Sequence, residues 1–210
     1  MVETPRRREI EDVASVLFRE HGYSGTSVRD IARALDIRGA SLYAHVASKQ
    51  DVLWSIIDRM ASRFEIAAAD ALAAASTPGA GPGERLMALV RAHVGVVADD
   101  VGRATVFVHE WRSVTGERHD QIVERRDRYE ERFRAVIAEG VATGTFAPID
   151  PEVAAAFTLT ALNGIVAWYQ PAGRIGPTDL ADLYADLALH AVLATDGRRE
   201  VPAGWREVPA

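Results

Sequence analysis

The chain has 210 residues, of which 24 are Lys or Arg and 30 are Asp or Glu, so its formal net charge is -6. Its hydrophobic fraction of 48% is ample for a packed core and argues against intrinsic disorder. The absence of cysteine excludes disulfide frameworks, thiolate zinc sites and cysteine nucleophiles. Taken over the whole chain, the acidic charge also argues against nucleic-acid binding, because proteins of that class usually carry a basic excess.

The first quarter of the chain shows apolar residues at helical spacing in three short segments. Thr4-Pro5 is a typical cap and first turn for a helix that Gly22 would end. A second helix is expected after Thr26 as its cap, and a short third one over 40–45 follows with almost no spacer. Such a pair matches the helix-turn-helix arrangement, in which the later helix can enter the DNA major groove. A generic helical hairpin fits the spacing equally well.

The rest of the chain is also helical by its spacing. A long helix capped by Ser48 is expected to reach Ala75, and the Pro- and Gly-rich segment Ser76–Gly83 is the clearest break. Further helices are expected near 84–98, 101–113, 117–141, from Asp150-Pro151 to Tyr169, and over 177–195. Nothing alternates like a strand, so the predicted fold class is all-α with about nine helices, followed by an irregular tail over 196–210.

One segment, Val153–Gly173, has no charged residue and could be mistaken for a membrane span. It is rich in alanine, carries several polar residues and meets Pro171 before reaching span length, so a helix buried on most of its circumference explains it better. The N-terminal segment lacks the unbroken apolar run of a signal peptide. The chain is therefore expected to be soluble and cytoplasmic, with no membrane partner.

The residues of the N-terminal segment decide between the hairpin and the DNA-binding arrangement. The run TSVRDIARALDIRGASLYAHVASK over 26–49 resembles the DNA-binding head of TetR-family transcriptional regulators. The matching features are Thr26, Ile31-Ala32, Ile37, Ser41-Leu42-Tyr43, His45, Ser48-Lys49 and Leu53. The resemblance implies a helix-turn-helix DNA-binding domain over 1–47. It also implies a ligand-binding and dimerisation domain over 48–195, with Ser48–Ala75 as the connecting helix.

Residue types suggest how such a head would contact DNA. Side chains able to donate hydrogen bonds to phosphate oxygens are Thr26, Ser41, Tyr43, His45 and Lys49. Residues at the start of the recognition helix, where base edges are nearest, are Arg38, Gly39 and Ala40. Arg6–Arg8 form either an arm that reaches the DNA backbone or minor groove, or a solvated charged start of the helix.

Three positions depart from the pattern of the family. Asp36 occupies the place of the usual turn glycine, and Asp is a residue that tolerates left-handed backbone geometry. Arg38 replaces the usual small hydroxyl cap of the recognition helix, and Val46 replaces an aromatic residue. The first two changes bear on how the recognition helix enters the groove and on which bases it reads.

The C-terminal part contains two helices that need partners. The uncharged helix over Val153–Tyr169 is apolar on more than one face and must pack against other helices there. The last helix has an apolar stripe that includes Leu180, Leu183, Leu187 and Val192. In the resembled family the last two helices pack with their twins in a four-helix bundle, which implies a homodimer. A monomer would leave a large apolar patch exposed.

A second, narrower resemblance covers residues 100–190. The stretches FVHEWR, RDRYE, EGVATGTF, NG, WY and GR are similar to a subgroup that regulates fatty-acid, phenylacetate and steroid-ring catabolism, several members of which release DNA on binding acyl-CoA thioesters. Such a ligand needs an apolar tunnel, an aromatic surface for adenine and cations for phosphates. The expected tunnel residues are Phe107, Trp111, Tyr129, Phe133 and Asn163, with Trp168 and Arg174 for adenine and phosphate. Ordinary core or interface aromatics remain the alternative.

No catalytic motif of standard spacing is present, so the chain is expected not to be an enzyme and to need no cofactor or metal. His93, His109 and His119 match no metal-site spacing and are expected to be solvated or capping residues. The leading hypothesis is a homodimeric repressor, released from a pseudo-palindromic double-stranded DNA operator by a small-molecule effector such as an acyl-CoA. The alternatives are a multidrug or antibiotic sensor, or a helical adaptor or carrier without DNA binding.

The distribution of charge weakens the inference from the total. Residues 1–50 hold eight Lys or Arg against seven Asp or Glu, whereas residues 51–210 hold sixteen against twenty-three. The acidity thus belongs to the C-terminal part. With so small a basic surplus, we expect modest non-specific DNA affinity and a need for two heads in tight binding.

Overall fold

The computed structural model describes residues 4–77 and 79–193. Within them the chain is all-α, as predicted, and has no β-strand apart from an isolated bridge between Phe146 and Leu193. The elements are α1 Pro5–Gly25, α2 Val28–Ala34, α3 Gly39–Tyr43, α4 Lys49–Ala74, α5 Pro82–Asp99, α6 Val101–Glu110, η1 Trp111–Ser113, α7 Glu117–Ala142, α8 Pro151–Asn163, η2 Gly164–Ala167 and α9 Pro177–Val192. The predicted tail over 196–210 lies outside the described residues.

The helix starts follow side-chain caps. Thr4 and Ser48 accept hydrogen bonds from backbone N–H groups in the first turns of α1 and α4, and Asp150 does the same for α8, as their sequence positions predict. The cap of α2 was predicted one residue too early. Ser27 caps this helix in a reciprocal capping box with Asp30.

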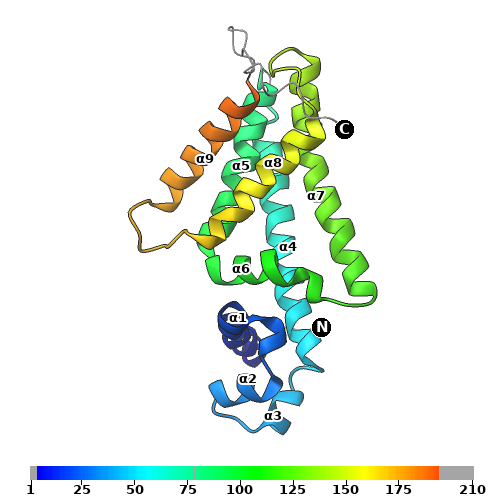
Figure 1. The fold of residues 1–210 in the computed structure, drawn as a ribbon, viewed down its shortest axis with the longest axis vertical. Helices are drawn as coiled ribbons and strands as arrows, with labels where there is room; N and C mark the ends of the chain where they lie inside the picture. The colour runs from blue at the N-terminus through cyan, green and yellow to red at the C-terminus, as the bar shows by residue number, and fades with distance from the viewer. Residues whose placement is uncertain (1–3, 78, 194–210) are drawn as a thin grey trace, which may run out of the picture.

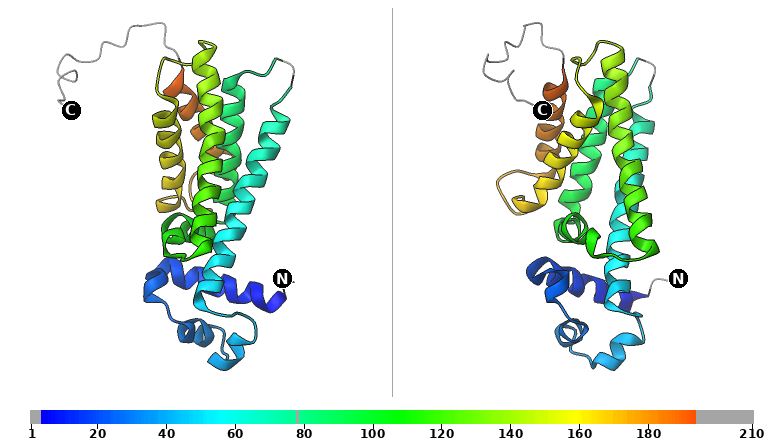
Figure 2. Two further views of the ribbon diagram at one scale, coloured as in Figure 1. Left: turned by 90° about the vertical axis from the view of Figure 1, so that its right-hand side faces the viewer. Right: turned by 45° about the vertical axis from the view of Figure 1, so that its right-hand side comes forward.

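The helices form two parts along the long axis of the molecule (Figure 1). Helices α1, α2 and α3 form the head at one end, and α4 runs from the head up into a bundle with α5, α7, α8 and α9. Helix α6 lies across the lower end of this bundle and packs against α1 (Figures 1 and 2). Helix α6 thus joins the lower end of the bundle to the head through α1.

Helix α5 is the centre of the bundle, because it packs against α4, α7 and α9. Its apolar side chains Leu86, Leu89 and Val90 are fully buried, as are Ile56 and Ile57 of α4. Burial of side chains of this size stabilises the fold by roughly 1.5–3 kcal/mol each. No helix in the described part of the chain is long and apolar enough to cross a membrane.

The EGVATGTF stretch at the end of α7 has a structural role. Phe146 packs directly on Gly140, so closely that a Cβ at this position would overlap the ring, and the Phe146 N–H donates to the Gly140 carbonyl at 2.9 Å. Gly144 makes the intervening turn with a φ of 73°. The stretch thus closes the top of the bundle rather than lining a ligand site.

The apolar stripe predicted for α9 divides into two faces. Leu180 and Val192 are buried within the bundle, whereas Leu183 and Leu187 are exposed. The exposed apolar residues of α8 and α9 are Val153, Phe157, Leu183 and Leu187, hereafter the α8/α9 face. Leu187 is 66% exposed, which is unusual for a leucine in a helix that is otherwise well packed.

Candidate nucleic-acid interface and ligand cavity

The turn between α2 and α3 has the tight geometry that the sequence predicts. Asp36 adopts a φ of 52°, so it provides the left-handed backbone for which glycine is usual. The next residue, Ile37, donates its N–H to the Ala32 carbonyl at 3.0 Å and closes the turn. Leu42 of α3 is buried in the core, so this side of α3 faces inward.

Most of the predicted DNA contacts lie on the open surface of α3. The exposed ones are Arg38, Ala40, Ser41, Tyr43 and His45, and Gly39 is half-buried. Tyr43 is 56% exposed, a large value for a tyrosine. Arg29, Arg33 and Arg38 line one shallow hollow at the α2–α3 turn. The three positively charged side chains therefore lie close together at the predicted start of the recognition helix.

Two of the predicted phosphate contacts have internal roles instead. Thr26 is only 2% exposed, and its hydroxyl lies within hydrogen-bond distance of the Leu17 and Gly22 carbonyls. The Lys49 ammonium donates to the carbonyls of Tyr23 and Thr26 at 2.8 and 2.7 Å and lies 4.0 Å from the centre of the Tyr23 ring. These contacts fasten the loop before α2 to the start of α4, and leave the Thr26 side chain no access to DNA.

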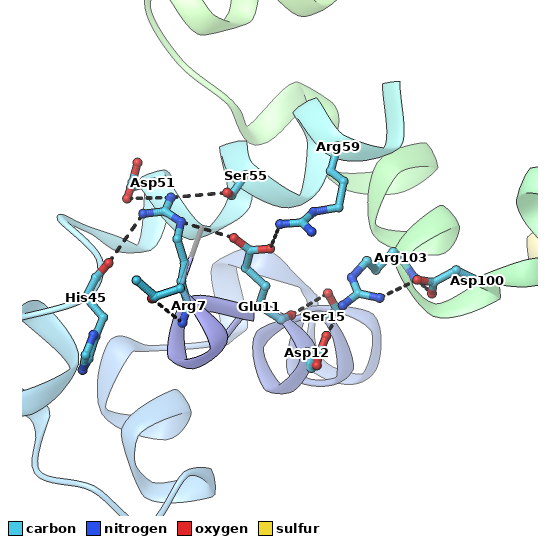
Figure 3. A network of polar contacts seen from close by, with 11 residues as sticks. Arg7, Glu11, Asp12, Ser15, His45, Asp51, Ser55, Arg59, Asp100 and Arg103 are labelled. Carbon is cyan, nitrogen blue, oxygen red and sulfur yellow. Dashed lines mark hydrogen bonds and ion pairs between the residues drawn. The ribbon is translucent and has the colours of Figure 1, made fainter. Parts of the chain in front are cut away.

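The arginines before the first apolar turn do not form an arm, because α1 already begins at Pro5. Arg6 forms an ion pair with Glu9 along the helix. Arg7 turns inward, where it forms ion pairs with Glu11 at 3.3 Å and with Asp51 of α4 at 3.1 Å (Figure 3).

A network of ion pairs joins the head to α4 and α6 (Figure 3). Glu11 of α1 is 1% exposed and accepts a hydrogen bond from Arg59 of α4 at 2.7 Å. Arg103 of α6 bridges Asp12 of α1 and Asp100. Breaking one partner of a buried pair costs about 3–5 kcal/mol, so this network favours one orientation of α1 relative to α4.

A cavity of about 310 Å³ lies inside the bundle, at the lower end of the range of ligand pockets. Its lining comes from α4, α5, α6, η1, α7 and α8. The lining residues are Ala61, Phe64, Glu65, His93, Phe107, Trp111, Arg125, Arg126, Asp127, Tyr129, Glu130, Ala156, Leu159, Thr160 and Asn163. Glu65 and Arg125 pair with each other through two hydrogen bonds of 2.8 Å, and these bonds lower the pKa of Glu65.

A guanidinium group stands among the aromatic residues of the cavity. The Arg126 guanidinium carbon lies 4.6 Å from the centre of the Trp111 ring and 5.6 Å from that of Phe107. Burial, together with the charge of Arg112, lowers the pKa of Arg126, but this group stays protonated at neutral pH. Among the described residues no carboxylate lies within ion-pair distance of Arg126. Asp127 and Glu130, which also line the cavity, interact electrostatically with Arg126 without forming an ion pair. The guanidinium can therefore still form an ion pair with a ligand.

The interior of the cavity holds a neutral polar pair that sequence reasoning missed. His93 was expected to be solvated or capping, but it is 3% exposed, and its Nδ1 lies 3.1 Å from the Tyr129 hydroxyl. Burial, with a smaller contribution from the Arg126 charge, lowers the pKa of His93 to about 3, and burial raises the pKa of Tyr129. The apolar neighbours of His93 along α5 carried the missing signal, since they predict that this position faces the core.

Four of the seven residues predicted for a ligand site line this cavity, namely Phe107, Trp111, Tyr129 and Asn163. Phe133 is fully buried behind Tyr129, with ring centres 5.6 Å apart, and does not reach the cavity. Trp168 is half-exposed and stacks on Tyr184 of α9, and Arg174 lies exposed in the loop before α9. Neither Trp168 nor Arg174 lines the cavity of its own chain.

The segment that lines the cavity also holds the head. Glu110 precedes Trp111, and its carboxylate accepts a hydrogen bond from the Tyr23 N–H of α1 at 2.9 Å and another from the Ser113 hydroxyl at 3.0 Å. The side-chain amide of Gln50, at the start of α4, donates to the Ser113 carbonyl at 2.7 Å. The α6–η1 junction therefore contacts the cavity on one side and the head on the other.

Comparison with known proteins agrees with both parts of this arrangement. Residues 10–56 match the family model of bacterial regulatory proteins of the tetR family, and residues 79–192 match the tetracyclin repressor-like C-terminal domain. The chain belongs to the TetR family. The HTH-type transcriptional repressor KstR2 of Rhodococcus jostii is 30% identical over 190 residues, which cover 88% of this chain and 89% of the relative. The chain is accordingly a transcriptional regulator with the head and body of this family.

Two solved structures share the fold. The ketosteroid transcriptional regulator KstR2 of Mycobacterium tuberculosis is 25% identical with a TM-score of 0.83, over 93% of this chain and 98% of that one. AibR, solved in complex with isovaleryl coenzyme A and operator DNA, is 28% identical with a TM-score of 0.75, over 87% of this chain and 97% of that one.

Proposed function

We propose that this TetR-family regulator is a cytoplasmic homodimeric repressor that leaves its operator when an acyl-CoA thioester binds in the bundle cavity. The observation that carries this proposal is the position of the α6–η1 junction. Trp111 lines the cavity, while the adjacent Glu110 holds the backbone of Tyr23 in the head. A ligand that favours a different position of Trp111 also favours a different position of the head. Such a ligand binds one of the two states more tightly than the other, and this difference in affinity is what coupling requires.

The Arg126 guanidinium on the cavity wall suits an anionic group of the effector. Arg126 forms no ion pair in the described part of the chain, although Glu130 and Asp127 interact with it electrostatically, so a phosphate or carboxylate of the ligand could pair with it directly. An acyl-CoA combines such charges with an apolar acyl group that suits Phe64, Phe107 and Leu159. A cationic dye or drug would face the Arg126 charge at short range. The related AibR, with isovaleryl coenzyme A bound, provides a precedent for this class of ligand.

The size of the cavity limits what enters it. A volume of about 310 Å³ accommodates a short or cyclic acyl group, but it is too small for a whole CoA thioester. The nucleotide part would therefore lie outside, beyond Arg126. This arrangement assigns Phe107, Trp111, Tyr129 and Asn163 to the acyl group.

The proposed dimer forms through the α8/α9 face. Val153 and Phe157 of α8 and Leu183 and Leu187 of α9 are exposed, and a shallow apolar hollow lies between the start of α8 and the end of α9. A face of this kind is stable in water when a second copy covers it. Two heads would then reach successive major grooves of a pseudo-palindromic operator.

A thermal-shift panel tests the class of effector. Short-chain and cyclic CoA thioesters should raise the melting temperature of the purified dimer, because a ligand that binds only the folded state stabilises it. Free CoA serves as the control for binding through the nucleotide alone. Stabilisation by dyes or antibiotics instead of thioesters would indicate a drug sensor.

A gel-shift assay with DNA upstream of its own gene should show a specific complex, and the lack of one would favour an adaptor without DNA binding.

A further inference from the structure

Asp51 joins the head to helix α7 of the bundle. It lies in the first turn of α4 and is only 5% exposed. One of its carboxylate oxygens pairs with Arg7 of α1 at 3.1 Å, and the other pairs with Arg118 of α7 at 3.3 Å. A buried carboxylate is stable only where opposite charges compensate it. One group thus binds both the head and α7, at the base of the helix that connects the head to the bundle.

The pairing of Asp51 with Arg7 holds the segment that follows α3. Arg7 Nη1 donates to the His45 carbonyl at 3.5 Å (Figure 3). The Ala47 N–H donates to the Asp51 carboxylate at 3.4 Å. The His45 N–H in turn donates to the Leu42 carbonyl at 2.9 Å, so His45 continues directly from the last turn of α3. Arg7 and Asp51 together therefore hold the end of the recognition helix relative to α4.

Helix α7 extends from this carboxylate to the cavity. Arg118 lies in its first turn. Arg126 and Tyr129, which line the cavity, follow about two and three turns later on the same unbroken helix. A rigid helix carries a shift at one point to its neighbouring turns. A ligand that favours a different position of Arg126 or Tyr129 therefore also favours a different position of Arg118.

The two ion pairs of Asp51 differ in how readily they break. The Arg7 side chain is 11% exposed, and its Nε also pairs with Glu11 at 3.3 Å. The Arg118 side chain is 40% exposed, and an ion pair of this exposure contributes little to stability. A modest shift of α7 can therefore break the Arg118 pair while Arg7 keeps its partners. Asp51 then loses its connection to α7 but not its connection to the head.

We propose that Arg118 and Asp51 form a connection between the ligand cavity and the recognition helix, with Arg7 as the positioning residue for α3. While the Arg118 pair is formed, α7 and the end of α3 are held by the same carboxylate, and without it α3 has more freedom relative to the body. This connection differs from the contact between Glu110 and Tyr23, because it runs along α7 and ends at α3 instead of α1. Its role in the ligand response rests on the proposed function, whereas its role in holding α3 does not.

The absence of cysteine allows a direct test without ligand. Two introduced cysteines, Ser41→Cys on α3 and Ala135→Cys on α7, carry spin labels, and pulsed electron paramagnetic resonance measures the distribution of distances between them. An excess of unlabelled protein removes distances between two copies. Arg118→Ala should broaden this distribution, because it frees the end of α3 from α7. The control Arg128→Ala, which removes another arginine of α7, should leave it unchanged.

Arg7→Gln shows whether Arg118 acts through Arg7. On its own it should broaden the distribution as Arg118→Ala does, and the double variant should be no broader than Arg7→Gln alone. Asp51→Asn takes the place of Arg7→Gln if that protein does not fold. An unchanged distribution in Arg118→Ala, or a double variant whose broadening is the sum of the two single effects, would overturn the inference.

Operator release tests the part of the inference that concerns the ligand. The measured quantity is the ratio of operator dissociation constants with and without a saturating thioester. Arg118→Ala should lower this ratio about threefold, as expected for the loss of one partly exposed ion pair, while Arg118→Lys, which keeps a cation near Asp51, should retain most of it. A wild-type ratio in Arg118→Ala would overturn the role in the ligand response. If no thioester binds the wild type, the proposed function fails by itself, and the distances between the labels still decide whether Arg118 holds α3.

Discussion

The Glu110 carboxylate accepts a hydrogen bond of 2.9 Å from the backbone N–H of Tyr23, although the two residues lie 87 positions apart. Tyr23 lies near the end of α1, and Lys49 of α4 binds its carbonyl at 2.8 Å. A single backbone segment is therefore held by the body through Glu110 and by the connecting helix through Lys49. Because Trp111 follows Glu110 and lines the cavity, one peptide bond and one hydrogen bond connect the cavity wall to the head.

Replacing Glu110 by Ala should weaken the response of DNA binding to ligand more than DNA binding itself. The substitution leaves the Tyr23 N–H without its acceptor, so the free energy of unfolding should fall by about 1.5 kcal/mol. The measurement is the ratio of operator dissociation constants with and without a saturating thioester. The coupling free energy between two such sites is typically about 1–3 kcal/mol, and we expect Glu110→Ala to lose most of this coupling.

The matched control is Glu110→Gln, which removes the charge but keeps an oxygen that can accept from Tyr23. Its ratio of dissociation constants should stay close to that of the wild type. A wild-type ratio in Glu110→Ala would show that the signal reaches the head by another route, such as the pairing of Arg103 with Asp12.

Sequence periodicity predicted the helices well, since their caps and breaks are local. Thr4, Ser48 and Asp150 act through neighbouring backbone N–H groups. The predicted break over Ser76–Gly83 does lie between α4 and α5, but its last two residues, Pro82 and Gly83, already belong to α5. The predicted cap of α2 failed because Thr26 and Ser27 are both good caps. Only the tertiary structure, which buries the Thr26 hydroxyl against carbonyls of α1, leaves the role to Ser27.

The candidate sites could be predicted only in part, because exposure is a property of the fold. Residue type correctly suggested that Lys49 donates hydrogen bonds, but its acceptors are carbonyls of the head. Phe133 and Tyr129 are one helical turn apart on α7, yet only Tyr129 reaches the cavity. His93 was missed because its residue type suggested solvent, although the buried apolar residues at helical spacing around it, Leu89, Val90 and Val97, place it on the core face of α5.

Replacing Arg38 by Ala should reduce both the affinity and the selectivity of operator binding. A side chain at the start of the recognition helix that reads a base edge contributes about 1–3 kcal/mol, and its loss relaxes specificity at that base. Tyr43→Phe should instead weaken binding to operator and random DNA alike, since a phosphate contact carries no sequence information. Fluorescence anisotropy with both duplexes separates the two effects.

The control for these variants is Arg128→Ala, because Arg128 lies exposed on α7 and pairs with Glu124 of the same helix. It should bind operator like the wild type. Unchanged operator affinity in both Arg38→Ala and Tyr43→Phe would contradict the assignment of α3 as the recognition helix.

Replacing Leu187 by Arg should convert the proposed dimer to a monomer. The substitution would bury an unpaired guanidinium in the proposed apolar interface, which costs several kcal/mol. Sedimentation equilibrium measures the oligomeric state. Ile66→Arg is the control, since Ile66 of α4 is 61% exposed, similar to Leu187, but lies outside the α8/α9 face. Dissociation by Ile66→Arg, or a Leu187→Arg protein that stays dimeric, would place the interface elsewhere.

Acid should destabilise the wild type more than His93→Leu. The pKa of His93 is about 3 in the folded state and 6.5 as its ordinary value, so between these pH values the unfolded chain binds a proton that the folded chain excludes. Stability from this group is thus present above about pH 6.5 and lost as the pH falls toward about 3. From pH 7 to pH 5 the loss amounts to about 2 kcal/mol.

Urea unfolding of both proteins at the two pH values measures this difference, because all other titrating groups are common to them. His93→Leu should lose about 2 kcal/mol less than the wild type on acidification. Parallel losses in the two proteins would mean that His93 is accessible to protons in the folded state, and hence that the cavity is open to bulk water.

Release of DNA by a thioester tests the central claim most directly. A labelled duplex from upstream of its own gene is bound by the full-length dimer, and a CoA thioester that raises the melting temperature is added while anisotropy is recorded. We expect the anisotropy to fall to that of free DNA, with free CoA and a drug or dye control leaving the complex intact. A duplex that stays bound when the thioester saturates the cavity would contradict the claim that ligand binding in the bundle controls the head.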